Sequence, residues 1–165
     1  MKSKRFTLGL LIFYLFALTW IIIFKLQFSF ENLPHIRNIN LIPFGQSVIV
    51  NGKMDFDEII QNALAFIPYG LFIHVLWEEK PLAKQLIPVI CTSLIYEIIQ
   101  FIFSIGASDI TDIISNSSGG IAGIAIAVFI SKVSGNGWIK FINIISFTGA
   151  IILTLFIAIL LLANM

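Results

Sequence analysis

Charge and cysteine are both scarce in this chain. Of its 165 residues, 10 are Lys or Arg and 9 are Asp or Glu, which is 12% of the sequence against about 25% in a typical soluble domain. Hydrophobic residues make up 58%. These proportions exclude a soluble globular enzyme, a disordered tail and a coiled coil, and they favour a small integral membrane protein. The single cysteine, Cys91, cannot form a disulfide within the chain. The formal net charge of +1 offers no face for a polyanion, so nucleic acid is not an expected partner.

Long apolar runs dominate what is present. A bilayer core about 30 Å thick requires about 20 mostly apolar residues in a spanning helix. Five stretches approach this length: 6–26, 59–77, 85–103, 110–130 and 141–162. We therefore predict an all-α fold, a polytopic membrane bundle of about five transmembrane helices in a single membrane domain, 1–165. The long connection 27–58 is predicted to be an ordered outer loop or a re-entrant segment.

The distribution of Lys and Arg predicts the orientation, because cytoplasmic loops carry an excess of these residues. With the N-terminus inside, seven of the ten are cytoplasmic: Lys2, Lys4, Arg5, Lys80, Lys84, Lys132 and Lys140. Lys25, Arg37 and Lys53 are then outside. Five spans place the C-terminus outside.

Polar residues recur on one face of the third predicted span. Ser93, Glu97 and Gln100 are spaced i, i+4 and i+7, so they share a helix face. Lipid cannot hydrogen-bond them, so this face is expected to point into the bundle. A carboxylate in a spanning helix costs about 2.5–3.5 kcal/mol on insertion scales, which favours a functional role for Glu97 over simple interhelical bonding.

The fourth predicted span repeats this pattern. Asp109, Asp112 and Asn116 are spaced i, i+3 and i+7. The alternative for the two carboxylates is structural, because Asp109 could cap this helix and Asp112 could favour its dipole. Small residues four apart predict close packing of this span against another helix: Gly119, Gly123 and Ala127.

Polar side chains from four regions are all predicted at the outer half of the membrane: Arg37, Asn40, Asn62, Glu97, Gln100, Asp109, Asp112 and Asn116. An ion path would need polar groups through the inner half as well. A polar pocket open to the outer side is therefore the expected arrangement.

These residues resemble the motifs of the VanZ-like family of bacterial membrane proteins. The stretch 37–44, RNINLIPF, resembles its "R…NLIPF" signature. Asn62-xxx-Phe66-x-Pro68-x-Gly70 is similar to its second block. Ser93-xxx-Glu97-xx-Gln100, followed by Asp109-xx-Asp112-xxx-Asn116-xx-Gly119, is similar to its third. The resemblance covers 37–127.

The resemblance implies a multi-pass protein of the bacterial cytoplasmic membrane, in a family named for a protein linked to teicoplanin resistance. It implies a membrane lipid or a lipid-linked peptidoglycan precursor as the ligand. We expect the chain to bind or modify a lipid head group and in this way to provide glycopeptide resistance. The alternative to an enzyme is a non-catalytic binder of the precursor or of a lipoglycopeptide. A small oligomeric transporter is the remaining alternative.

Roles for individual residues follow from their chemistry. Catalysis would depend on Glu97, Asp109 and Asp112, with Glu97 as a general acid or base. The same three carboxylates could instead hold Mg²⁺ or Ca²⁺ that bridges to phosphate. The predicted ligand-binding residues are Arg37, as a phosphate partner, and Asn40, Asn62, Ser93, Gln100 and Asn116.

Overall fold

The fold is a bundle of long helices. The computed structural model describes residues 3–27, 36–45, 49–50, 53–54 and 56–163. Its helices are α1 (Lys4–Ile22), α2 (Asp57–Trp77), α3 (Leu82–Phe103), α4 (Ile110–Ser134) and α5 (Trp138–Ala163). Four helical segments are long and apolar enough to cross a membrane, and the fourth, Ile110–Leu162, contains α4 and α5 up to Leu162. The predicted all-α fold is confirmed.

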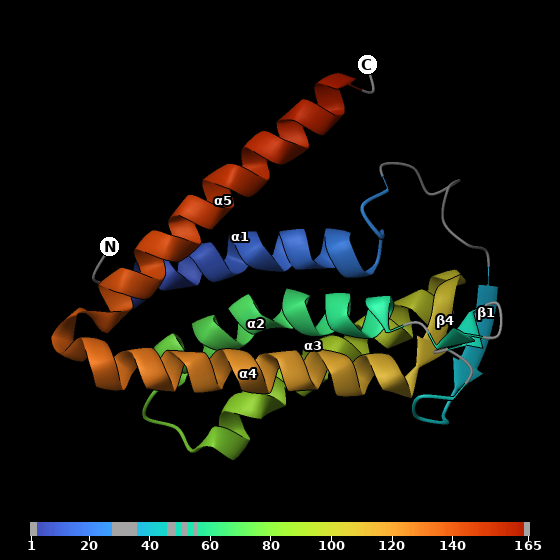
Figure 1. Ribbon diagram of the computed structural model, residues 1–165, viewed down its shortest axis with the longest axis horizontal. Helices are drawn as coiled ribbons and strands as arrows, with labels where there is room; N and C mark the ends of the chain where they lie inside the picture. The colour runs from blue at the N-terminus through green and yellow to red at the C-terminus, as the bar shows by residue number, and fades with distance from the viewer. Residues whose placement is uncertain (1–2, 28–35, 46–48, 51–52, 55, 164–165) are drawn as a thin grey trace.

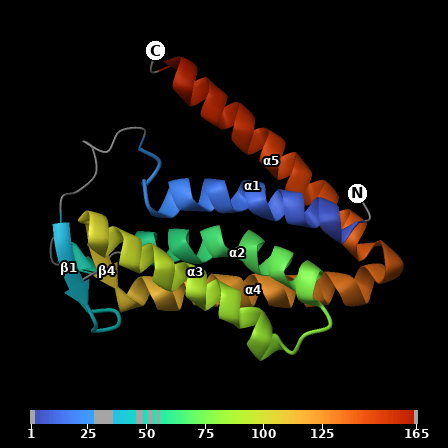
Figure 2. The same cartoon turned by 180° about the vertical axis from the view of Figure 1, so that it is seen from behind.

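Consecutive helices run in opposite directions (Figure 1). Both views show α1, α2, α3 and α4 alongside one another, whereas α5 starts near the N-terminal end of α1 and diverges from the bundle (Figure 2). Large apolar side chains remain exposed on the outer faces of the helices, for example Phe16, Ile95 and Phe129. Lipid is the solvent that such faces require.

Small residues of α4 allow it to pack closely on α2. A Cβ atom added at Gly119 or Gly123 would overlap the backbone carbonyl oxygen of Ala63 or Ile67 in α2. Ala127 continues the same stripe and is fully buried. The predicted close packing of this span is confirmed, and it holds the polar start of α4 against that of α2.

A short two-stranded sheet closes one end of the bundle. Strand β1 (Ile36–Asn40) pairs in parallel with β4 (Ile105–Asp109), so that Asn40 lies opposite Asp109. A separate two-residue hairpin pairs β2 (Ile49–Val50) with β3 (Lys53–Met54). Strands β1 and β4 lie where α3 ends and α4 begins (Figure 1). We call this the strand end of the bundle.

The strands were not expected from the sequence. Strand β4 occupies five of the six residues between α3 and α4. Its partner strand is distant in the sequence, since Ile36 pairs with Ile105, 69 residues later. The predicted outer loop or re-entrant segment, 27–58, contributes β1 at the strand end. Its residues 28–35, 46–48, 51–52 and 55 lie outside the described part of the chain.

Candidate functional site

Glu97 is fixed at the strand end by the segment that links α3 to α4. Its Oε2 accepts a hydrogen bond from the backbone N–H of Asp109 at 2.8 Å. The hydroxyl of Ser108 donates to the backbone carbonyl of Glu97 at 2.7 Å. The Glu97 side chain is only 4% exposed, and among the described residues its Oε1 has no hydrogen-bond partner. One carboxylate oxygen is therefore anchored, and the other is buried without a hydrogen-bond partner among the described residues.

Asp109 caps α4. Its backbone is extended, and its Oδ1 accepts from the backbone N–H of Thr111 at 2.7 Å. Its Oδ2 accepts from Asn40 Nδ2, across the β1–β4 pair, at 2.9 Å. The capping alternative raised by the sequence therefore holds, since both oxygens of Asp109 bond to the protein.

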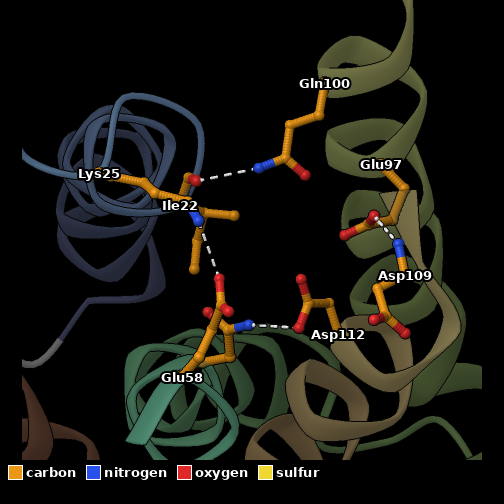
Figure 3. Close-up of polar contacts among 8 residues, drawn as sticks. Ile22, Lys25, Glu58, Glu97, Gln100, Asp109 and Asp112 are labelled. Atoms are coloured by element: carbon orange, nitrogen blue, oxygen red, sulfur yellow. Dashed lines mark hydrogen bonds and ion pairs between the residues drawn. The ribbon is translucent and has the colours of Figure 1, made fainter. Parts of the chain in front are cut away.

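Asp112, on α4, and Gln100, three residues after Glu97 on α3 itself, face the same space as the Glu97 carboxyl (Figure 3). Asn62 Nδ2 in α2 donates to Asp112 Oδ1 at 2.9 Å. Gln100 Nε2 donates to the backbone carbonyl of Ile22, at the end of α1, at 3.3 Å. Figure 3 shows the two carboxyl groups and the Gln100 amide on three sides of one space. Gln100 is 4% exposed, and its Oε1 has no partner among the residues that the structure describes.

A cavity of about 340 Å³ opens at this point. Its polar lining residues are Lys25, Asp57, Glu58, Gln61, Asn62, Gln100 and Asp112. Lys25 Nζ and Glu58 Oε1 form an ion pair at 2.9 Å, and both side chains are about half exposed. Three carboxyl groups and one ammonium group therefore line the cavity.

An apolar groove of about 250 Å³ lies on the other side of Glu97, between α3 and α4. Glu97, Asn40 and Asp109 are among its lining residues. The apolar remainder is Ile39, Leu41, Leu94, Ile98, Phe101, Ile110 and Ile113. Figure 3 shows the second Glu97 oxygen pointing toward Asp112, so Glu97 lines the groove and faces a residue that lines the cavity.

Two predicted site residues lie one helical turn deeper. Asn116 Nδ2 donates to Ser93 Oγ at 2.9 Å, and both residues are completely buried. This bond joins α3 to α4 below Glu97. Asn116 Oδ1 has no partner within the described part of the chain.

Arg37 lies away from the cavity. Its Nε and Nη2 donate to the backbone carbonyls of Phe101 and Ile102, at 3.2 and 3.0 Å, and its guanidinium lies over the Phe101 ring. These carbonyls belong to the last turn of α3, where the regular helical hydrogen bonds end, and the Phe101 carbonyl also accepts from the backbone N–H of Ser104 at 3.3 Å. The structure thus gives Arg37 a capping role, and its predicted contact with phosphate stays a prediction.

The oxygen donors at this site are of the type that Mg²⁺ and Ca²⁺ prefer. Glu97 and Asp112 each direct an oxygen into the common space, whereas both oxygens of Asp109 already accept hydrogen bonds. In residues 3–27, 36–45, 49–50, 53–54 and 56–163, no group of three or more His, Cys, Asp or Glu side chains is placed to hold a metal. The proposed ion stays a prediction.

Three charged residues, Lys25, Asp57 and Glu58, are not among the site residues predicted from the sequence. All three line the cavity. The signal available in the sequence was their position at the end of the first apolar run and directly before the second, because both boundaries lie at the predicted outer surface.

The whole site falls within a region that matches a known protein family. The VanZ/LLP1 family matches residues 11–131. The chain belongs to the VanZ/LLP1 family. It is also 37% identical over 155 residues to Protein VanZ of Enterococcus faecium, covering 93% of this chain and 91% of that protein. No solved structure matches the chain. The resemblance inferred from the motifs is confirmed, and the protein is a VanZ-like, multi-pass membrane protein. The VanZ/LLP1 match ends before α5, and none of the described residues of α5 lines the cavity or the groove.

Proposed function

We propose that this VanZ-like protein binds the head group of a membrane lipid, or of a lipid-linked peptidoglycan precursor, in the cavity at the strand end. The proposal rests on the Gln100 side chain, which lines the cavity and is almost completely buried. Its Oε1 has no hydrogen-bond partner among the described residues. A buried polar atom without a partner is costly, and a ligand that bonds to it recovers that cost.

The apolar groove beside Glu97 supports a lipid in particular. An acyl or prenyl chain in this groove would lie against Leu94, Ile98 and Ile113, with its head group on the cavity side of Glu97. The polar groups converge at one end of the helices, which favours a head-group site over a continuous transport path.

The distribution of basic residues supports an outer-leaflet site in the bacterial cytoplasmic membrane. Lys25, Arg37 and Lys53 belong to the strand end, and the six other Lys and Arg residues that the structure describes belong to the opposite end of the bundle. Since basic loops favour the cytoplasm, the cavity opens outward.

Glu97 is the group most suited to chemistry on a bound head group. Asp109 fixes one of its oxygens, and the other points into the space beside Asp112. A carboxyl group held in this way can transfer a proton to or from a head-group oxygen. Mg²⁺ or Ca²⁺, held by Glu97 and Asp112, would offset the charge of a phosphate. Modification or shielding of the precursor would provide glycopeptide resistance of the teicoplanin type.

The test is lipid binding by the purified full chain. Protein in detergent is mixed with phospholipids and a lipid-linked wall precursor, with and without Mg²⁺, and separated by gel filtration. Mass spectrometry then measures retained lipids and any new products. Asp112→Asn should retain several-fold less of the preferred lipid than wild type, and Glu79→Gln, which removes a carboxylate at the other end of the bundle, should not. Identical lipid profiles for all three proteins would contradict the proposal.

The same samples separate an enzyme from a binder. New products that disappear in Glu97→Gln indicate catalysis, whereas retained but unaltered lipid indicates a non-catalytic binder. Expression in a teicoplanin-susceptible host then tests whether either activity raises resistance.

A further inference from the structure

We propose that the cavity selects a head group that carries a primary ammonium. This inference rests on the proposed head-group function and adds to it the chemical class of the ligand. The positive group would enter among Glu97, Gln100 and Asp112, and the phosphate would remain toward Lys25 at the mouth of the cavity.

The hydrogen-bonding groups that face the shared space are acceptors. Glu97 and Gln100 each contribute a buried oxygen that has no partner in the described part of the chain. The Gln100 amide nitrogen bonds to α1, which turns its oxygen toward the space. Likewise, Asn62 directs its amide nitrogen to one oxygen of Asp112, and the other oxygen of that carboxylate faces Glu97 and Gln100.

An ammonium group fits this arrangement because it offers three N–H donors and no acceptor. The three surrounding side chains, on α3 and α4, supply three oxygens on different sides of one space. A phosphate in the same place would bring its own oxygens against these oxygens, with no donor between them. The site therefore discriminates by hydrogen-bond type as well as by charge.

The excess of acidic groups in the cavity lining also favours an ammonium group. Three carboxyl groups, of Asp57, Glu58 and Asp112, line the cavity with one ammonium, that of Lys25. The buried Glu97 carboxyl faces Asp112 in the same space (Figure 3). In a cavity bounded by low-dielectric helices, such an excess of acidic groups favours a cation.

A primary ammonium could come from the head group of an aminophospholipid or from a lysine side chain in the peptide of a lipid-linked precursor. The test compares matched pairs. Phosphatidylethanolamine is set against N-acetyl-phosphatidylethanolamine, and a lysine-containing precursor against its N-acetylated form. Each pair competes for the full-length protein in detergent, and native mass spectrometry measures the bound ratio. Soluble ethanolamine, added as a competitor, shows whether the amine binds without its lipid.

Wild type should prefer the amine in at least one pair by about tenfold, since hydrogen bonds to a charged group carry roughly that discrimination or more. The pair that shows the preference identifies the source. Asp112→Asn and Glu97→Gln each place an amide nitrogen where an acceptor stood, so the preference should fall below about twofold. Glu79→Gln is the matched control and should retain it.

The outcomes separate the two proposals. Retention that depends on Asp112 but is equal for amine and N-acetyl forms overturns the ammonium inference and leaves the head-group site intact. A preference that persists unchanged in both variants also overturns the inference. Retention that none of the variants alters overturns the head-group function itself.

Discussion

The backbone N–H of Asp109 donates to the Oε2 of Glu97 at 2.8 Å, which joins the last residue of β4 to the inward face of α3. Asp109 also caps α4 through Thr111 and accepts from Asn40 in β1. Asp109 thereby links four elements, which are α3, β4, α4 and β1.

Two substitutions at Glu97 should separate its structural role from its charge. In Glu97→Gln, the amide oxygen can still accept from Asp109, so the stability should change little. Glu97→Leu leaves that buried N–H without a partner and should lower the free energy of unfolding by about 1–3 kcal/mol. Denaturation in mixed micelles, followed by circular dichroism, measures both. Equal destabilisation by Gln and Leu would show that the bond to Asp109 contributes nothing.

Gly119→Ala should disrupt the contact between α2 and α4. The added Cβ overlaps the carbonyl oxygen of Ala63, which is backbone and cannot move alone. Overpacking of this kind typically costs about 1–3 kcal/mol, so the thermal midpoint of the purified protein should fall. Gly9→Ala is the matched control, since a Cβ at Gly9 in α1 meets no atom within 4 Å. A midpoint for Gly119→Ala at or above that of Gly9→Ala would rule out the close packing.

Arg37→Lys should loosen the end of α3. The guanidinium reaches two carbonyl oxygens, of Phe101 and Ile102, through separate nitrogens, and a single ammonium cannot reproduce that fork. Because Arg37 is exposed, we expect a loss of about 1 kcal/mol, accompanied by faster hydrogen exchange in the last turn of α3. Unchanged exchange there would contradict the capping role. A loss of lipid retention without a loss of stability would instead support the predicted phosphate contact.

Lys25→Met should change ligand preference more than stability. The Lys25–Glu58 ion pair is about half exposed, and such pairs contribute about 0–1 kcal/mol. Its removal makes the cavity more negative, so retention of phosphatidylethanolamine relative to phosphatidylglycerol should rise several-fold at low salt and less at high salt. Competition in native mass spectrometry at two salt concentrations checks this. A ratio that falls, or that does not depend on the salt concentration, would contradict electrostatic selection at the mouth of the cavity.

Helix positions followed from the sequence because apolar length is sufficient to define a spanning helix. The shared face of Ser93, Glu97 and Gln100 was likewise evident from helical periodicity, and all three residues are buried. The β1–β4 pair could not be predicted, because it depends on which distant segment meets the five residues after α3. For the same reason the role of Arg37 was not evident: only the folded chain brings it to the carbonyls of α3.

The central claim is that Asp112 lies in a cavity open to the outer surface. The direct measurement is labelling of Asp112→Cys, in a chain whose Cys91 is replaced by Ser, with a membrane-impermeant cationic thiol reagent on intact Gram-positive cells. We predict that position 112 reacts in intact cells and that Glu79→Cys reacts only after permeabilisation. Ile95→Cys, on the lipid-facing side of α3, should react neither in intact nor in permeabilised cells. Labelling of position 112 only after permeabilisation, or no faster than at position 95, would contradict the outward-facing cavity.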